Sequence, residues 1–180
     1  MSNHSAVIQW QRKCAKFTDG QYSRVHEWSF DGGATVQASS SPHVVKIPLS
    51  DPTCVDPEEG FIASLSSCHM LFFLGLASKA GYLVDSYTDS AEGHLSKNEL
   101  SKIALTSVTL RPKVIFSGTK QMTESAFQSL HHEAHESCFL ASSVKTEIRV
   151  EGTWEQLQPS SSCGHKLYSK VLTIEPNRLL

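Results

Sequence analysis

The chain has 180 residues, of which 39% are hydrophobic and 19% are charged, and its formal net charge at pH 7 is −2. This composition is typical of a single folded domain and excludes a disordered chain, which would be poorer in apolar residues. The near-neutral charge and the lack of a basic run exclude a nucleic-acid-binding protein.

Neither a secretory signal nor a membrane span is expected. Residues 1–13 lack a basic region followed by a long apolar run, which a secretory signal requires. The longest apolar stretch, 70–77, is far shorter than the ~20 residues of a transmembrane helix. We therefore expect a cytoplasmic protein, in which cysteines are kept reduced and serve as core residues, reactive thiols or metal ligands. The five cysteines are Cys14, Cys54, Cys68, Cys138 and Cys163.

Before residue 50, apolar and polar residues alternate with the period of two that predicts β-strands. The pattern covers 7–17 and 22–30, and the DGG tripeptide at 31–33 supplies a tight turn before a partner strand at 34–39. Arg24 lies on the aromatic side of its predicted strand, which alternation turns toward the core.

The segment that begins at Asp56 carries the signals of a complete helix. Asp56 can cap the first turn, Pro57 occupies the first helical position, and Glu59 stands where a capping-box carboxylate belongs. Gly81 predicts the end of the helix. The apolar residues between these limits occupy several faces, which predicts a central helix that is covered on both sides.

The remaining pattern predicts an α+β fold. Two further strands are expected near 82–96 and 102–117, followed by a second helix from about 123 to 141 and a strand at 143–151. Strands, a helix, strands, a helix and a last strand in this order are typical of the α+β class.

The composition changes at 156–165, where Pro, Ser and Gly replace the alternating apolar residues. Such a change is typical of the end of a packed domain. We therefore predict a domain over 1–155, followed by a tail or an appended strand over 156–180.

Cys68 lies in the middle of the predicted buried helix, where an unpaired cysteine is most often a small core residue. Its neighbour His69 points about 100° away around the helix and is poorly placed to act as its general base. Arg24 needs an anionic partner, because an unpaired charge that faces the core is costly. The candidates are Glu58, Glu59 and the thiolate of Cys68, which a nearby guanidinium would favour. The alternatives for Arg24 are a structural salt bridge and a place on an edge strand with solvent on both faces.

Cys138, in the second predicted helix, is a thiol that could meet Cys68. Helices packed about 8–10 Å apart bring facing Cα atoms to roughly 3.4–5.4 Å at the crossing point, which overlaps the ~4.4–6.8 Å range found in disulfides. If the two predicted helices cross at these cysteines, the pair can oxidise reversibly.

A metal site is the competing hypothesis for this part of the chain. His131, His135 and Cys138 have the spacing i, i+4, i+7, which places them on one helical face. A structural zinc would need a fourth ligand, for which Cys68 or His69 could serve. Clusters of this kind are more often polar surface residues, and we expect no bound metal.

Three segments carry a resemblance to a known family. They are YSRVHEWSFDGG at 22–33, PEEGFIASLSSCHM at 57–70 and AHESCFLASSVKTEI at 134–148. In order and approximate spacing they resemble the OsmC/Ohr family of thiol-dependent organic hydroperoxide reductases, over about residues 5–151. The resemblance implies the OsmC-like α+β fold, in which antiparallel sheets wrap around a long buried central helix in an intertwined homodimer.

The resemblance also implies roles for four residues. Cys68 would be the peroxidatic thiolate and Cys138 the resolving thiol, while Arg24 would stabilise the thiolate and Glu58 would orient the arginine. Glu58 and Cys68 lie ~15 Å apart along one helix. If both residues meet Arg24, some of the groups are therefore expected to come from different subunits.

The implied reaction is the reduction of an organic hydroperoxide to an alcohol, with an external dithiol such as a lipoyl protein as reductant and no cofactor. Two departures from the family pattern bear on the substrate. Arg24 stands in a Ser-Arg-Val-His context instead of Gly-Arg-Asp, and Phe139 follows Cys138 where the family often has proline. The alternatives are a metal-binding or sensing protein and a non-catalytic OsmC-like protein that binds a small molecule.

Overall fold

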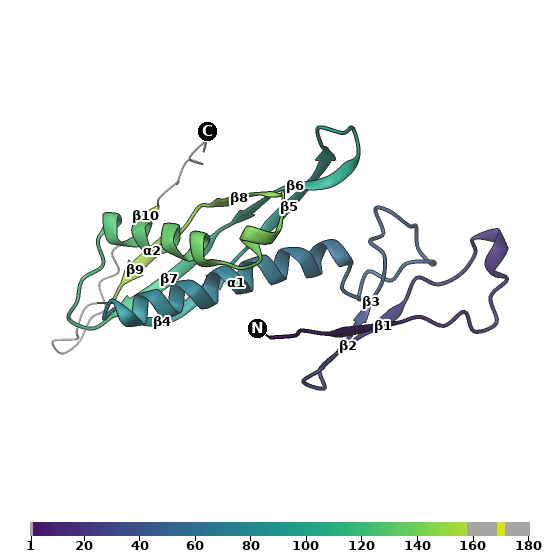
Figure 1. The fold of residues 1–180 in the computed structure, drawn as a ribbon, viewed down its shortest axis with the longest axis horizontal. Helices are drawn as coiled ribbons and strands as arrows, with labels where there is room; N and C mark the ends of the chain where they lie inside the picture. Colours follow the sequence, from purple (N-terminus) through teal and green to yellow (C-terminus); the bar gives the residue numbers. More distant parts are fainter. Residues whose placement is uncertain (1, 158–168, 172–180) are drawn as a thin grey trace. The chain divides into compact units, whose positions relative to one another are not determined.

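The computed structural model describes residues 2–157 and 169–171. The chain forms two compact units, Met1–Phe61 and Ile62–Leu180, which are described separately (Figure 1). The long helix α1 (Pro57–Lys79) begins in the first unit and continues in the second. The α+β class predicted from the sequence is confirmed.

The first unit holds a three-stranded antiparallel sheet with the order β1-β2-β3. Its strands are β1 (Ala6–Gln9), β2 (His26–Phe30) and β3 (Thr35–Ala38), and a single 3-10 turn, η1 (Phe17–Asp19), lies between β1 and β2. The predicted turn at 31–33 is confirmed. Gly33 has a φ of 84°, which glycine adopts without a steric penalty, and its N–H donates to the carbonyl of Phe30.

The strands of this sheet are shorter than the alternation predicted. Arg24 lies before β2, because the N–H of Arg24 donates to the carbonyl of Leu49 at 2.8 Å, outside the sheet. The Nε1–H of Trp10 likewise donates to the carbonyl of Ser23 at 2.8 Å. These bonds to a loop and a side chain replace the β-ladder that the pattern indicated over 22–25, while 26–30 form β2.

The start of α1 follows the predicted capping box. The N–H of Glu59 donates to Asp56 Oδ1 at 2.8 Å, and the N–H of Asp56 donates to Glu59 Oε2 at 3.0 Å. The first turn also requires glycine at position 60, because a Cβ atom there would lie 2.7 Å from Cη2 of Trp28. The helix ends as predicted at Gly81, which has a φ of 76°.

The second unit contains two sheets. The four-stranded sheet has the order β10-β9-β7-β4, and the three-stranded sheet has the order β5-β6-β8. The ladders β6–β8 and β7–β9 are parallel, while β4–β7, β5–β6 and β9–β10 are antiparallel. The strands are β4 (Leu83–Asp89), β5 (Glu92–Lys97), β6 (Ile103–Leu110), β7 (Pro112–Ser117), β8 (Glu147–Val150), β9 (Thr153–Gln156) and β10 (Ser169–Val171).

Each long strand predicted in the middle of the chain is in fact two strands. The breaks lie at 90–91 and at Arg111, where the N–H of Arg111 donates to Asp89 Oδ1 at 2.6 Å instead of joining a ladder. The chain therefore passes from one sheet to the other at both points. The predicted boundary at 155 stays a prediction. Of the residues beyond it, Gln156, Leu157 and the edge strand β10 are described, and the rest lie outside the described residues.

The second helix, α2 (Glu124–Ser137), begins where the sequence indicated and ends earlier. Thr123 caps it, and its Oγ1 accepts the N–H of Ala126 at 3.3 Å. Cys138 is the C-cap, with an extended backbone at φ −70° and ψ 114°, so it lies just past the helix. The short 3-10 turn η2 (Ala141–Ser143) follows.

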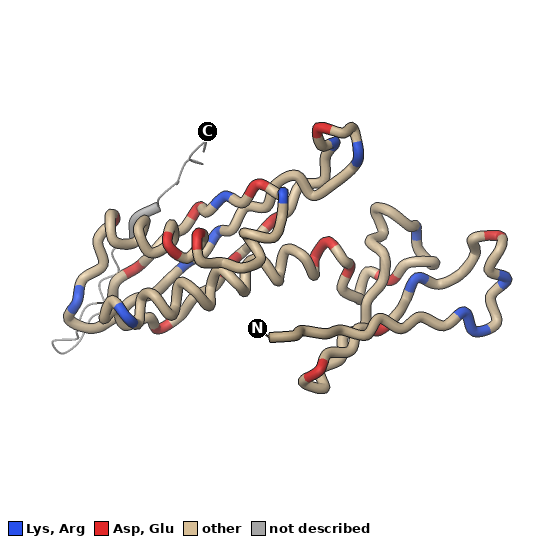
Figure 2. The backbone as a smooth tube through the Cα atoms, viewed as in Figure 1, with Lys and Arg blue, Asp and Glu red and all other residues tan. Residues whose placement is uncertain are grey.

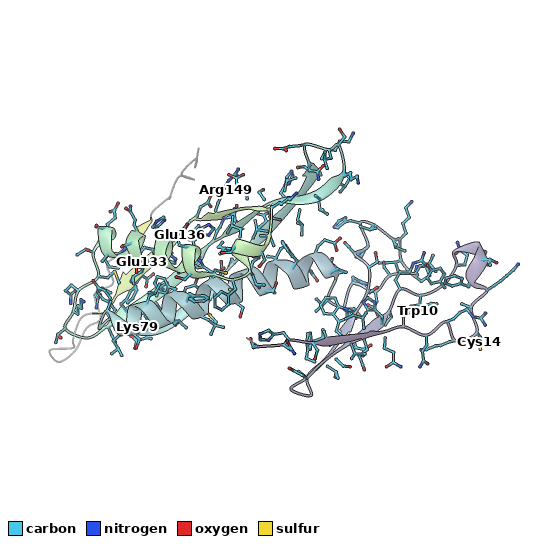
Figure 3. All side chains as sticks on the ribbon, viewed as in Figure 1. Trp10, Cys14, Lys79, Glu133, Glu136 and Arg149 are labelled. Carbon is cyan, nitrogen blue, oxygen red and sulfur yellow. The ribbon has the colours of Figure 1, made fainter. Side chains whose placement is uncertain are left out.

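One stripe of α1 packs against one stripe of α2 and the inner face of β7. The buried residues are Leu65, His69, Phe73 and Ala77 of α1, Phe127, Leu130, His131 and Ala134 of α2, and Val114 and Phe116 of β7. The exposed Glu133 and Glu136 lie on the opposite side of α2 (Figure 3).

The expectation that α1 is covered on both sides is not met within one chain, where Leu71 is 64% exposed. Figure 2 shows that the charges of α1 lie only toward its ends, and no charged residue interrupts 60–78. By length and composition alone α1 could cross a membrane, a test that core helices of soluble proteins also pass.

Candidate functional site

The structure brings Cys68 and Cys138 together within the second unit. Cys68 lies in the middle of α1, Cys138 caps the end of α2, and their side chains are hydrogen-bonded. Both thiols are free. Two unpaired thiols in hydrogen-bond contact form a pair that can be oxidised to a disulfide.

The two sulfurs differ in their surroundings. Cys138 is only 1% exposed, whereas Cys68 is half-buried. Burial raises the pKa of Cys138, and its hydrogen bond with Cys68 raises that pKa further, although the N–H groups of Ala141 and Leu140 act in the opposite direction. Cys138 therefore keeps its proton at neutral pH, and its S–H is the donor in the thiol pair.

Apolar side chains flank the thiol pair. Phe72 lies one helical turn after Cys68, and its ring meets that of Phe139 edge to face, with centroids 5.1 Å apart. Phe139 follows Cys138 and is 75% exposed. The region beside the thiols is thus an apolar surface that is partly open to solvent.

Arg24 belongs to the first unit, and its predicted meeting with Cys68 stays a prediction. Its guanidinium Nη1 donates to the carbonyls of Gly20, at 2.9 Å, and Tyr22. The guanidinium also lies 3.8 Å from the centroid of the Tyr22 ring. Within the described part of the chain no carboxylate pairs with Arg24, so its charge is held in place without being neutralised.

Glu58 and Glu59, the two carboxylates predicted near Arg24, have different surroundings. Glu59 is engaged in the capping box with Asp56. Glu58 is half-buried in the first turn of α1 and forms no ion pair with any residue that the structure describes. Of the two, Glu58 is the carboxylate with unused acceptor capacity.

A buried pair of histidines joins the two helices. His69 Nε2 and His131 Nδ1 are 2.9 Å apart, and each residue is 1% exposed. The other ring nitrogens, Nδ1 of His69 and Nε2 of His131, are buried and have no hydrogen-bond partner among the described residues. An unpaired buried polar atom lowers the stability of the folded state by on the order of 1–3 kcal/mol, so burying this pair is destabilising.

Burial keeps both imidazoles neutral. It lowers the pKa of His69 to about 4, and the nearby His135 contributes in the same direction. Burial likewise lowers the pKa of His131 to about 2, with a further contribution from His69. Only one proton lies between the two nitrogens at neutral pH, so one ring donates and the other accepts.

The pair was not predicted, although the sequence carried a signal for it. His69 continues the i, i+4 spacing of Leu65, Phe73 and Ala77, and His131 lies four residues after Phe127. The ligand cluster at 131–138, considered as the alternative, is not formed, because His131 faces His69 and Cys138 lies beyond the end of α2. Among the described residues, no group of three His, Cys, Asp or Glu side chains is placed to hold a metal ion.

Two cysteines lie elsewhere and the fifth lies outside the described residues. Cys14, labelled in Figure 3, is exposed in the segment after β1, and Cys54 is half-buried in the segment before α1. Cys163 falls within the range that the structure leaves undescribed. Cys68 and Cys138 are therefore the candidate reactive pair.

Comparison with solved structures identifies proteins of the same fold. An OsmC-like protein of unknown function from Vibrio cholerae is 56% identical, with a TM-score of 0.83, and the match covers 84% of this chain and 99% of that one. An organic hydroperoxide resistance protein from Elizabethkingia anophelis is 17% identical, with a TM-score of 0.59, over 86% of this chain and 96% of that one. A Bacillus subtilis organic hydroperoxide resistance protein is 15% identical, with a TM-score of 0.57, over 84% and 98%.

No curated protein sequence matches this chain. The model of the family described as OsmC-like protein matches residues 50–152, which contain α1, α2 and both cysteines of the candidate pair. Because that model matches more than half of the chain and the Vibrio cholerae structure is 56% identical over 84% of it, the chain belongs to the OsmC-like protein family.

Proposed function

We propose that this protein is a thiol-dependent peroxidase that reduces organic hydroperoxides to alcohols, with Cys68 as the peroxidatic and Cys138 as the resolving cysteine. The observation that carries the proposal is the hydrogen-bonded pair of free thiols at the junction of α1 and α2. The family assignment supports it, as do the names of the Elizabethkingia anophelis and Bacillus subtilis proteins of the same fold.

The proposed reaction has three steps. The Cys68 thiolate attacks the distal oxygen of the hydroperoxide, the O–O bond breaks, and the alkoxide takes a proton to leave as the alcohol. The resulting sulfenic acid condenses with the Cys138 thiol, which releases water and forms the disulfide. An external dithiol then reduces this disulfide and becomes oxidised to its own disulfide, which returns both thiols to the protein.

The different depths of the sulfurs support these roles. A peroxide can reach the half-buried Cys68, whereas Cys138 is 1% exposed and is shielded from direct attack. Cys138 also retains its proton at neutral pH, because burial raises its pKa. The first nucleophile must be within reach of the peroxide, and of the two sulfurs that of the half-buried Cys68 is the accessible one.

Arg24 is proposed to stabilise the Cys68 thiolate, and Glu58 to orient the guanidinium. The carbonyls of Gly20 and Tyr22 already hold Arg24 in one orientation, and its charge is not neutralised by a described carboxylate. A positive charge near a thiol favours the anion. In a homodimer, some of these groups are expected to come from different subunits.

The apolar surface formed by Phe72 and Phe139 supports an organic substrate. An alkyl or aryl hydroperoxide can bury its carbon skeleton there, whereas hydrogen peroxide has no carbon skeleton to bury. For the reductant we propose a dithiol of the lipoyl type, in the cytoplasm, where thiols are kept reduced.

A homodimer is proposed as the active form. Within one chain only one stripe of α1 is buried, while Leu71 of α1 is 64% exposed and Val7 and Ile8 of β1 are 63% and 59% exposed. Apolar side chains at this exposure are typical of surfaces that a second subunit covers. Sedimentation equilibrium tests this, and a monomer at micromolar concentration would contradict it.

The catalytic roles are tested by adding one equivalent of cumene hydroperoxide to the reduced protein and measuring its intact mass. The wild type is expected to lose two hydrogens through a Cys68–Cys138 crosslink. Cys138→Ser should gain one oxygen and turn over once, and Cys68→Ser should not react. Cys54→Ser, which changes another half-buried thiol, is the matched control and should behave as wild type. Full peroxidase activity in Cys68→Ser would contradict the proposal and leave a non-catalytic binding protein as the better hypothesis.

A further inference from the structure

The hydrogen bond between His69 and His131 lies close to the thiol pair along both helices. His69 follows Cys68 on α1, and His131 lies about two helical turns before Cys138 on α2. Both histidines and both cysteines belong to the second unit. The positions of the two sulfurs therefore depend on how α1 is placed against α2 at the histidines.

Apolar packing alone fixes this placement weakly. The buried stripe of α1 repeats every four residues, as Leu65, His69, Phe73 and Ala77, and apolar contacts have no direction. A slip of one turn would still place a residue of this stripe at each contact position on α2, although the side chains differ in size. It would also move Cys68 by about 6 Å along the helix axis. Two sulfurs must approach to about 2.05 Å to form a bond, so such a slip would separate the pair.

A directional contact removes this ambiguity. The hydrogen bond between His69 Nε2 and His131 Nδ1, at 2.9 Å, can form in only one register of the helices. The His131 ring is also stacked on Phe73, with centroids 4.3 Å apart, and meets Phe127 edge to face at 4.4 Å. These ring contacts fix the orientation of His131 within the core.

Stability does not explain the pair. One nitrogen of each ring is buried without a partner among the described residues, which opposes folding. Apolar side chains of similar size could fill the same space without that cost. Fixing the register of packed helices is the best-attested role of buried polar contacts in such interfaces.

We propose that His69 and His131 are positioning residues whose hydrogen bond fixes the register of α1 on α2 that keeps the Cys68 and Cys138 thiols in hydrogen-bond contact. The inference rests on the proposed function, because it assigns the pair a role in forming that disulfide. Neither imidazole touches the peroxide or makes a bond in the reaction.

The test measures the equilibrium between protein dithiol and glutathione disulfide, which yields the protein disulfide and two molecules of glutathione. His69→Leu/His131→Leu removes the hydrogen bond with side chains of similar volume. His131→Asn places an amide atom where Nδ1 stands and keeps the bond. His132→Leu changes the adjacent exposed histidine and is the matched control. Alkylation and intact mass give the fraction of disulfide, and urea unfolding of the reduced proteins gives their stability.

The double leucine variant is expected to fold with at least wild-type stability while its disulfide equilibrium constant falls tenfold or more. His131→Asn and His132→Leu should stay within about threefold of the wild type. An unchanged constant in the double variant would overturn the inference, as would an unfolded double variant or a loss in His131→Asn as large as in the double variant. A wild-type protein that forms no Cys68–Cys138 disulfide would overturn the proposed function as well, so the two failures are distinguishable.

Discussion

The neutral histidine pair predicts a steep loss of stability in mild acid. Burial lowers the pKa of His69 to about 4 and that of His131 to about 2. In the unfolded chain both groups titrate near about 6.5. Because the folded pKa values lie below the unfolded ones, the unfolded chain binds more protons below pH ~6.5, and stability falls as the pH is lowered. Above that pH both groups are neutral in either state and contribute no pH dependence.

The magnitude follows from the width of this window. For each histidine, the free energy of unfolding falls by about 1.4 kcal/mol per pH unit as the pH drops from the unfolded pKa to the folded pKa of that residue. At pH 4.5 the two histidines together lower the free energy of unfolding by about 5 kcal/mol relative to pH 7. This is a large part of the ~5–15 kcal/mol by which a typical domain is stable. The nearby His135 also disfavours the charged form of His69 and so contributes to the lowered pKa of His69.

Urea unfolding of the reduced protein at pH 7.0, 5.5 and 4.5 measures this dependence. Between pH 7.0 and 4.5, the free energy of unfolding of the wild type should fall by about 5 kcal/mol more than that of His69→Leu/His131→Leu. His132→Leu should retain the wild-type slope, since His132 is exposed on the same helix. Parallel losses in the wild type and the double variant would refute the reasoning, because the buried pair would then contribute nothing to acid unfolding.

Three further substitutions test the first unit and the start of α1. Gly60→Ala places a Cβ atom 2.7 Å from Cη2 of Trp28 and should cost about 1–3 kcal/mol in urea unfolding, whereas Gly75→Ala, which meets nothing within 4 Å, should be neutral or stabilising. Equal effects of the two substitutions would contradict the close contact. Asp56→Ala removes one side of the capping box and should cost about 1 kcal/mol, and an unchanged urea midpoint would show that the cap is dispensable. Arg24→Gln should slow the single-turnover reaction with cumene hydroperoxide by about tenfold or more, since one pKa unit of lost thiolate stabilisation is about 1.4 kcal/mol, and an unchanged rate would remove Arg24 from the proposed site.

The start and end of α1 could be predicted because the signals are local. The capping box of Asp56 and Glu59 uses groups within one turn, and Gly81 supplies the positive φ that ends the helix. The turn at 31–33 is local in the same sense. A single sequence is sufficient wherever the hydrogen-bond partners are close neighbours along the chain.

The features that the sequence did not predict depend on partners far away in the chain. Arg24 falls outside β2 because its N–H finds the carbonyl of Leu49, which no alternation pattern encodes. The strand predicted at 102–117 is broken at Arg111 by a bond to Asp89 from another strand. His69 and His131 are 62 residues apart, so their meeting follows from the helix crossing and not from either helix alone.

The order Cys68-His69 on α1 links the redox pair to the core. Consecutive helical residues point about 100° apart, so when His69 is fixed against α2, the direction of Cys68 is fixed as well. A rotation of α1 that moved the Cys68 sulfur away from Cys138 would have to break a buried hydrogen bond between two neutral rings that have no other partner among the described residues. In the proposed mechanism, the reactivity of the thiol pair therefore depends on residues that take no part in the chemistry. For the same reason, conditions that charge the histidines are expected to separate the sulfurs before they change the cysteines themselves.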